Sequence, residues 1–337
     1  MTWSFIKHIS KHLERPKLGE QKAPTLWPSS ATAIINEEVI GKCRRQSYFR
    51  FAKDSYHFDP KYDHLKPLVN IINEHKAPPS KYLQWIWIQG SLYEDYCINL
   101  AKESGVYIGD QISVYVPGYN ISGKLDLIVI NPETTKFHIV EVKSVYGFNA
   151  NSVLGTEAQH KKNLLGTPRD SNLMQIGFYQ WWYGNSNSDF GPALLTYGAR
   201  DTGRYAEYMV TVEKGDDDLD YIFYQGHTPI TTSKVNSNIT IQSILENYKQ
   251  ISDSVNAEKI TIPPPDYELS YSQAKIQSLY DQGLLSKTDK TQFEKRQKQI
   301  EEGKKRIVKA VEKGDWQCRF CDYKTICNGQ DVLKEFQ

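Results

Sequence analysis

A pair of apolar, strand-like segments joined by a short turn constrains the fold of this chain more than any other feature. The segments span residues 121–130 and 136–143, and the five residues between them, Asn-Pro-Glu-Thr-Thr, have the composition of a turn. We therefore predict an antiparallel hairpin in which Asn131 and Lys136 close a four-residue loop. Such a closure fixes the register, because each residue of one strand then faces one residue of the other.

In this register Asp126 and Glu141 stand directly opposite each other, with Cβ atoms about 4.5–5.5 Å apart. Lys143 shares their face, because strand side chains alternate with period two. Two facing carboxylates repel each other unless a cation lies between them, so the hairpin predicts a metal site with an ammonium group beside it. The other face is expected to pack on a core and carries Leu125, Leu127, Val129, Val140 and Val142. In a simpler alternative, Lys124 falls opposite Lys143 and the four charges form a solvated checkerboard of weak ion pairs.

Composition limits the possible functions. The 337 residues suffice for one large or two ordinary domains, and a formal net charge of +1 gives no global signature of nucleic-acid binding. Local basic clusters are more often solvated helix faces than phosphate contacts. No apolar run approaches the roughly 18–20 residues of a membrane span, and the N-terminus lacks the apolar segment of a signal peptide. We therefore expect an intracellular protein (cytoplasmic, or in the host cytoplasm if viral) without a membrane partner.

The five cysteines form the second informative pattern. Cys318, Cys321 and Cys327 follow a C-x2-C-x5-C spacing that lets their thiolates converge on one soft-metal centre. A fourth ligand is needed, and Cys43 in polar surroundings suits this role better than Cys97, which lies on an apolar helix stripe as a buried free thiol would. Zinc and an iron–sulfur cluster both accept four thiolates. One distant upstream cysteine plus a three-cysteine tail favours iron–sulfur, and unligated cysteines are the remaining alternative.

The chain divides into four predicted regions. They are an N-terminal arm (1–28), a core that includes the first cluster cysteine (29–213), a charged helical region (214–315) and a cysteine-rich tail (316–337) that closes onto Cys43. Within the core we expect helices at about 30–53, 82–104 and 172–183, the last capped by Ser171, and strands at about 106–109, 111–116, 121–130, 136–143, 192–198 and 205–213. Residues 147–168 are too long for an ordinary connection and are expected to be an active-site flap or a disordered loop. The predicted fold class is α/β, with a mixed central sheet flanked by helices.

Two further sets of polar residues are candidates for the same site. Glu94 places an acid within the 82–104 helix, where in isolation it would be a solvated helix residue. Gln175 and Tyr179 are four residues apart and share one helix face. Taken alone, that pair would be an interior face with one hydrogen bond.

Together and in this order, the motifs resemble the RecB-like branch of the PD-(D/E)XK nuclease superfamily, and in particular its iron–sulfur members. These include the CRISPR-associated exonucleases, the nuclease domain of the AddB helicase–nuclease and the eukaryotic single-strand exonucleases. The matching elements are Cys43, G-x-x-x-Glu94, G-x-x-Asp126, Glu141-x-Lys143, Gln175-x-x-x-Tyr179 and C-x2-C-x5-C at 318–327. The chain departs from the family pattern by lacking a Pro before the Asp and by its long 147–168 and 214–310 segments.

The resemblance implies a restriction-endonuclease-like core with helical insertions, and a metal-dependent nuclease acting on DNA with single-stranded ends. It implies that Glu94, Asp126, Glu141 and the backbone carbonyl of Val142 hold Mg²⁺ or Mn²⁺, that Lys143, Gln175 and Tyr179 complete the catalytic site, and that Cys43, Cys318, Cys321 and Cys327 hold a structural 4Fe–4S cluster. A helicase, recombination or CRISPR-adaptation protein would be the partner. The alternative functions are a non-catalytic nucleic-acid-binding module with a structural metal, and a zinc-stabilised interaction protein.

Overall fold

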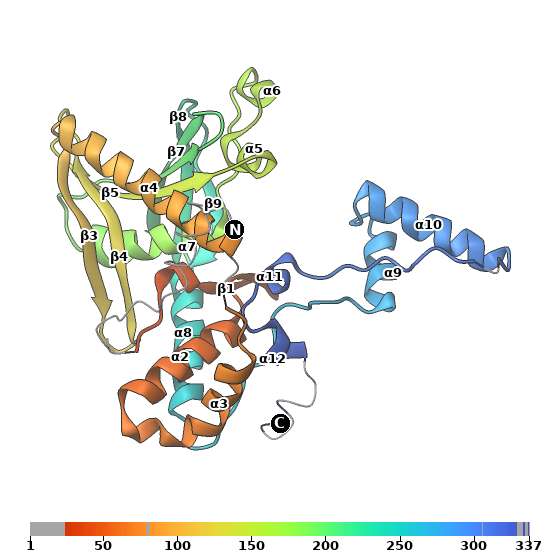
Figure 1. Cartoon of the computed structure of the whole chain (residues 1–337). Helices are drawn as coiled ribbons and strands as arrows, with labels where there is room; N and C mark the ends of the chain where they lie inside the picture. Colours follow the sequence, from red (N-terminus) through yellow and green to blue (C-terminus); the bar gives the residue numbers. More distant parts are fainter. Residues whose placement is uncertain (1–23, 79–80, 305, 329–332, 334–335, 337) are drawn as a thin grey trace, which may run out of the picture.

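A seven-stranded sheet lies at the centre of the computed structural model, which describes residues 24–78, 81–304, 306–328, 333 and 336 (Figure 1). The strands, in their order across the sheet, are β3 (Tyr107–Val116), β4 (Ile121–Ile130), β5 (Phe137–Val145), β6 (Ala193–Ala199), β7 (Tyr205–Lys214), β8 (Asp220–Thr228) and β9 (Val235–Thr240). Neighbouring strands are antiparallel except β5 and β6, which run parallel. The predicted α/β class with a mixed, helix-flanked sheet is therefore confirmed.

The parallel pair β5–β6 requires a long crossover connection, because two parallel strands start at the same end of a sheet. The crossover comprises α5 (Phe148–Leu154), α6 (Glu157–His160), α7 (Asp170–Tyr179) and the π-helical turn η3 (Gln180–Gly184). The hydroxyl of Tyr208 on β7 donates to the carbonyls of Val153, at 2.5 Å, and Gly166, at 2.9 Å. Residues 147–168, expected to be a flap or a disordered loop, are instead two short helices anchored on the sheet.

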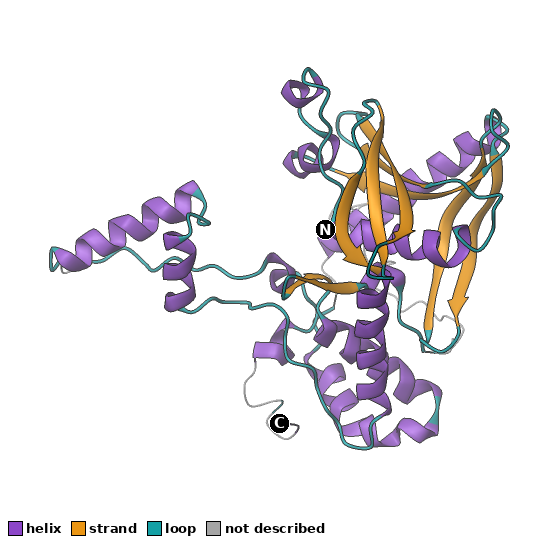
Figure 2. Cartoon of the chain, turned by 180° about the vertical axis from the view of Figure 1, so that it is seen from behind, coloured by secondary structure: helices purple, strands orange, loops and turns teal. Residues whose placement is uncertain are grey.

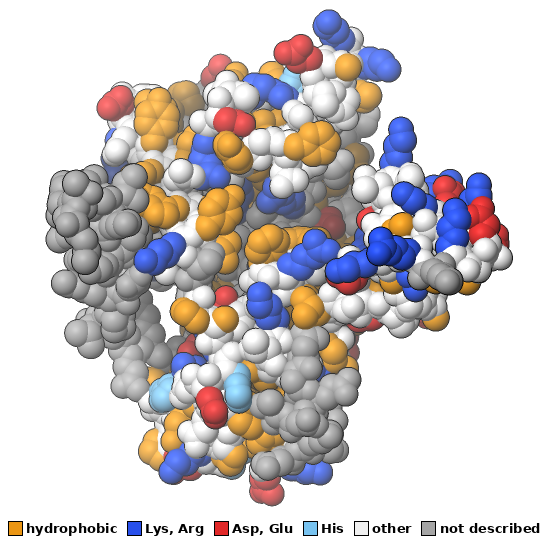
Figure 3. Space-filling view, turned by 45° about the vertical axis from the view of Figure 1, so that its right-hand side comes forward, with side chains coloured by type: hydrophobic (Ala, Val, Ile, Leu, Met, Phe, Trp, Pro, Cys, Tyr) orange, Lys and Arg blue, Asp and Glu red, His pale blue; other side chains and the backbone are white. Residues whose placement is uncertain are grey.

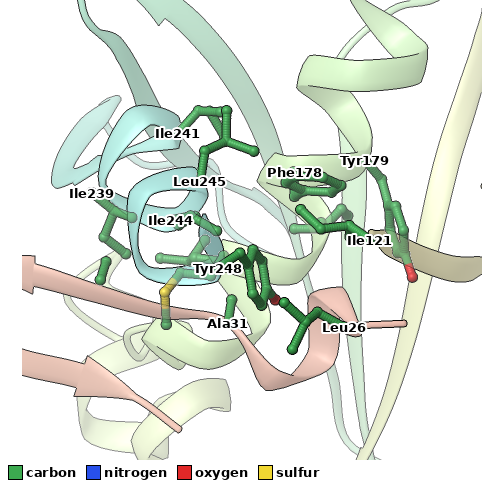
Figure 4. Close-up of a cluster of buried hydrophobic side chains, with 14 of the residues drawn as sticks. Leu26, Ala31, Ile121, Phe178, Tyr179, Ile239, Ile241, Ile244, Leu245 and Tyr248 are labelled. Carbon is green, nitrogen blue, oxygen red and sulfur yellow. The ribbon is translucent and has the colours of Figure 1, made fainter. Parts of the chain in front are cut away.

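Helices cover both faces of the sheet (Figure 2). On one face, Ile98 and Ala101 of α4 (Lys81–Glu103) pack on apolar side chains of β4 and β5. On the other face, α7 and α8 (Ile241–Asn256) form the large core shown in Figure 4, where Phe178 of α7 and Tyr248 of α8 lie close to Ile121 of β4. The apolar residues of α8 recur every three or four positions, which gives this helix one continuous buried stripe.

A smaller helical layer extends from the end of α8. It contains α2 (Arg44–Phe58), η2 (Pro60–Leu65) and α3 (Lys66–His75). Between this layer and the sheet lie η1 (Pro28–Ser30), which contacts α7 and β4, and the hairpin of β1 (Thr32–Ile35) and β2 (Glu38–Gly41), which contacts α7, α8 and β9. The chain returns to this layer at its C-terminal end through α11 (Trp316–Arg319) and α12 (Lys324–Asn328). There the Ala77 amide donates to the Asp322 carbonyl at 3.0 Å, so two segments distant in sequence lie side by side.

Two helices stand apart from the rest. α9 (Gln273–Asp281) and α10 (Lys287–Glu301) project from the body on two extended segments (Figure 1). None of the helices in the described part of the chain combines the length and the apolar character needed to cross a membrane.

Several sequence predictions for the N-terminal part are wrong. The helix expected at 30–53 is a hairpin followed by α2, and Cys43 precedes this helix instead of lying within it. The hairpin forms because Asn36 and Glu37 both adopt positive φ, as a two-residue turn requires, and Gly41 at φ +93° redirects the chain into α2. Residues 1–23 of the predicted arm lie outside the described residues, whereas Leu26 is fully buried.

Two further predictions are corrected. Residues 214–310 were expected to be helical, yet β8 and β9 extend the sheet as far as Thr240. β8 is rich in aromatic and β-branched residues, which favour strands, and it buries Ile222 and Gly226. The cap of α7 is Arg169, without a side-chain hydrogen bond, instead of Ser171. The helices predicted at 82–104 and 172–183 lie close to where they were expected. So do the strands of the core, except that those predicted at 106–109 and 111–116 form the single strand β3.

Candidate active site

The β4–β5 hairpin has the register that the sequence predicts. Leu127 pairs with Val140 and Ile130 with Phe137, and the Asn131 amide donates to the Lys136 carbonyl at 2.9 Å. One step beyond the last pair, this register places Asp126 opposite Glu141.

The ladder between the strands ends at this step. Here the Val142 amide donates to Oδ2 of Asp126 at 2.9 Å, so a carboxylate oxygen takes the place of a backbone acceptor. Side-chain alternation also breaks, because Leu125 packs in the large core whereas Leu127 packs beneath α4. The prediction that all five apolar residues share one face is therefore wrong for Leu125. The break turns the Asp126 side chain sideways, toward β5.

Glu141 is the most unusual residue of the site. Its side chain is fully buried (0 % exposed), Oε1 contacts the Nζ of Lys143, and Oε2 has no hydrogen-bond partner among the described residues. Burial raises the pKa of Glu141 to about 8, with the opposing effect of Lys143 and the added effect of the nearby Asp126 included. A solvated checkerboard of charges is therefore excluded, since one member of it has no contact with water.

Lys143 keeps its charge in this setting. Burial lowers its pKa, but the negative charges of Glu141 and Asp126 outweigh that effect and leave the pKa above its ordinary value. Lys124, its predicted cross-strand neighbour, is exposed. The site therefore carries the charged ammonium group of Lys143 beside the carboxyl groups of Asp126 and Glu141.

Glu94 lies close enough to Asp126 to be affected by its charge. Burial and then Asp126 raise the pKa of Glu94 to about 7. The Nε2 of Gln111 on β3 donates to Oε1 of Glu94 at 2.5 Å, which holds this carboxylate above the sheet. Gln111 adopts φ +48° in the middle of its strand. Sequence reasoning missed Gln111, and the one signal near it was the predicted break between the strands at 106–109 and 111–116.

Gln175 and Tyr179 lie on α7, on the face of the sheet opposite α4, and both are buried. The hydroxyl of Tyr179 donates to the Lys124 carbonyl at 3.0 Å, and burial raises its pKa. A Cβ atom on Gly123 would lie 2.5 Å from this hydroxyl oxygen, so the glycine three residues before Asp126 allows the close approach. The two α7 residues line a cavity of about 670 Å³ together with Trp27, Gly123 and Lys124, and the site acids are not part of its lining.

The donor chemistry of this site fits a hard divalent cation, because Glu94, Asp126 and Glu141 offer carboxylate oxygens. The unpartnered Oε2 of Glu141 is the atom that most needs a cation. Within the part of the chain that the structure describes, however, no group of three or more His, Cys, Asp or Glu side chains is arranged to hold an ion. Val142 contributes its amide to Asp126, and its side chain is buried beneath α4. The three carboxyl groups thus lie near one another, but their oxygens are not arranged as a complete set of ligands around one ion.

The four predicted cluster cysteines come together at a second place. Cys43, Cys318, Cys321 and Cys327 all line one cavity of about 200 Å³ between α2, α11 and α12. Burial raises the pKa of Cys318 to about 12 and that of Cys321 to about 11, and the neighbouring thiols contribute to both shifts. Such thiols are neutral without a metal. Four sulfur donors on one cavity fit a thiolate-ligated centre, but among the described residues they are not arranged to hold an ion. Cys97 lies on α4 and packs with the apolar cluster there.

Comparisons with protein-family models, with curated proteins and with solved structures each found no match for this chain.

Proposed function

We propose that this protein is a divalent-metal-dependent nuclease that hydrolyses phosphodiester bonds of DNA, with a restriction-endonuclease-like core and a structural iron–sulfur cluster. The observation that carries the proposal is the fully buried Glu141, which lies against Asp126 and Lys143 and whose Oε2 has no hydrogen-bond donor among the described residues. A buried acid in this environment is costly unless a cation compensates it.

The order of the elements supports the same conclusion. Each motif of the resemblance lies on a separate element around one point of the sheet: Glu94 on α4, Asp126 on β4, Glu141 and Lys143 on β5, and Gln175 and Tyr179 on α7. These residues come from both faces of the sheet and span much of the chain. A solvated surface patch would not bring together polar residues from four separate elements in this way.

The residues would divide the chemistry among them. Asp126, Glu141 and the Val142 carbonyl would hold Mg²⁺ or Mn²⁺, with Glu94 as a further ligand. When bound, such an ion neutralises charge on the scissile phosphate and makes water a better nucleophile. Lys143 would position the attacking water or stabilise charge that develops on the phosphate.

Gln175 and Tyr179 on α7 would support the site and the bound DNA. The Tyr179 hydroxyl already engages the Lys124 carbonyl, so it would keep β4 in place while Gln175 faces the neighbouring cavity. Both would orient the DNA strand or order the site. Substrates with single-stranded ends are proposed on the resemblance alone.

The cysteine cavity would hold the 4Fe–4S cluster. It joins the residue that precedes α2 to the tail that follows α10, and it lies apart from the acids. A structural role is therefore proposed in place of electron transfer.

A matched set of variants tests the proposal. We expect Glu141→Ala and Lys143→Ala to abolish Mn²⁺-dependent degradation of end-labelled single-stranded DNA while circular dichroism and visible absorption stay unchanged. Glu133→Ala is the control, because Glu133 lies exposed in the turn of the same hairpin. Wild-type activity in either active-site variant contradicts the assignment. DNA binding by the wild type without any EDTA-sensitive degradation favours the non-catalytic binding module instead.

A further inference from the structure

The projecting helices form a small packing unit of their own, here called the arm (residues 271–313). Its core consists of Ile276, Leu285, Phe293 and Val311, and it shares no residue with the other two apolar clusters. At its base the Tyr271 amide donates to the Lys313 carbonyl and the Asp315 amide to the Glu268 carbonyl, both at 2.7 Å. The arm is thus attached by a two-stranded stem and projects into solvent (Figures 1 and 2).

The arm is strongly basic although the whole chain is nearly neutral. Residues 271–313 contain eleven Lys and Arg against six Asp and Glu, a net charge of +5, whereas the complete chain carries +1. The remainder of the protein therefore carries −4. In Figure 3, Lys and Arg side chains gather on the arm.

Part of this charge lines a groove along α10. The groove encloses about 710 Å³ between α10 and the segment that runs back beside it, and its lining consists of Lys287, Thr288, Thr291, Gln292, Lys295, Val308 and Lys309. Positions 287, 291 and 295 share one helix face, because they are four residues apart. The groove thus presents three ammonium groups and two hydroxyl groups on one side of the arm.

The three groove lysines differ from their neighbours in having no carboxylate partner in the part of the chain that the structure describes. Among the described residues, no ion pair involves Lys287, Lys295 or Lys309. In contrast, Lys290 lies 3.9 Å from Glu294, and Lys298 and Lys304 lie 3.9 and 2.8 Å from Glu302. Uncompensated ammonium groups that line one groove attract a polyanion.

The walls of the groove are fixed by hydrogen bonds. The Nε2 of Gln292 donates to the carbonyl of Lys309 at 3.2 Å, and Nη1 of Arg296 donates to the carbonyl of Val308 at 2.6 Å. The Val308 amide donates in turn to Oε1 of Gln299 at 2.8 Å. These bonds hold the returning segment against α10, so the backbone that carries the groove lysines is in place before any ligand binds.

We infer that the arm binds the phosphate backbone of duplex DNA through Lys287, Lys295 and Lys309. The choice of DNA as the polymer rests on the proposed nuclease function. The preference for duplex over single strand comes from the aromatic residues. Single-strand binders stack bases on exposed aromatic rings, but Phe293 is buried, Tyr280 stacks on it at 4.6 Å, and the hydroxyl of Tyr271 donates to Asp315.

The proposed role of the arm is to position the DNA. Backbone contacts fix position without reading sequence. The arm would hold the duplex flanking a single-stranded end while that end enters the site on the sheet.

A binding experiment tests the inference without relying on cleavage. Fluorescence anisotropy of a labelled duplex DNA is measured in EDTA over a range of NaCl concentrations, in a Glu141→Ala background. We compare Lys287→Ala/Lys295→Ala/Lys309→Ala with the matched control Lys290→Ala/Lys298→Ala/Lys304→Ala, which removes the same charge from ion-paired positions. Circular dichroism verifies that both triple variants are folded.

The groove variant is expected to lower the slope of log K against log salt by up to about 2.7, because each lost phosphate contact contributes about 0.9. Its affinity should fall on the order of 100-fold at about 0.1 M salt, with a much smaller change in the control. Equal slopes in the two triple variants overturn the inference, as does a groove effect confined to single-stranded DNA. If the wild type never degrades DNA but the groove effect is present, the nuclease proposal fails and the arm inference stands.

Discussion

Replacing Glu141 by Gln should stabilise the metal-free protein at alkaline pH while it destroys the metal site. The substitution keeps the shape of the side chain but removes a carboxyl group that is fully buried and half unpartnered. A neutral amide has no charge to desolvate, so the variant escapes the cost that the wild type carries once Glu141 ionises.

The magnitude follows from the pKa of Glu141, which burial raises from its ordinary 4.5 to about 8. At about 1.4 kcal/mol per pKa unit, this shift corresponds to on the order of 4–5 kcal/mol. Below pH 4.5 the carboxyl is protonated in both the folded and the unfolded chain, and nothing is lost. Between 4.5 and 8 the unfolded chain releases the proton first, so the stability of the wild type falls as the pH rises. Above this range the loss is complete and constant.

Urea unfolding followed by tryptophan fluorescence measures this difference in EDTA at about pH 5.5 and about pH 8.5. We expect Glu141→Gln to gain stability relative to the wild type between the two conditions, and the exposed Glu133→Gln to follow the wild type. Mn²⁺ at about 100 times its Kd should narrow this difference at the higher pH, since such a ligand stabilises only the wild type, by about 2.7 kcal/mol. If the wild type and Glu141→Gln change in parallel with pH, the buried-acid reasoning is refuted.

Three further substitutions probe the surroundings of the two sites. Cys43→Ser should abolish iron content and absorption near the violet edge of the visible in anaerobically purified protein. Cys97→Ser should retain both. The opposite result would assign the fourth ligand to Cys97 on α4. Gly123→Ala places a Cβ atom 2.5 Å from the Tyr179 hydroxyl, so it should cost about 1–3 kcal/mol in thermal unfolding and reduce cleavage; full activity would show that this contact is dispensable. Gln111→Ala removes the hydrogen bond to the α4 carboxylate, and calorimetry should show Mn²⁺ affinity about 10-fold weaker; an unchanged affinity would exclude this supporting role.

The hairpin register was predictable because it depends on a single local feature. Once the Asn131 amide meets the Lys136 carbonyl, every pair farther along the two strands is fixed. The position of Glu94 on a helix was predictable for a similar reason, since α4 ends at Glu103, shortly before Gly105, which has the positive φ of a helix stop. In both cases residues close together in the sequence were sufficient to predict the structure.

The parts that were missed depend on tertiary contacts. Alternation predicted Leu125 and Leu127 on one face, but the Asp126 carboxylate accepts a backbone amide of β5 and breaks the pattern between them. The break puts Asp126 within reach of Glu141 and Glu94, so the sequence rule fails at the point where the site forms. The role of Gln111 was invisible for the same reason, because its partner lies on α4, distant in the chain.

The cysteine cavity connects the two proposals through the stem of the arm. Residues 267–270 and Gln317 line the cavity with the four thiols, and these segments adjoin the stem at Glu268 and Asp315. A cluster held by Cys43 and the tail would therefore anchor the base of the arm to the start of α2. The large core of the sheet depends on apolar packing that includes none of the stem. Loss of the cluster should consequently free the arm before it weakens the sheet, which makes duplex binding more sensitive than cleavage of short single strands to the Cys43→Ser substitution.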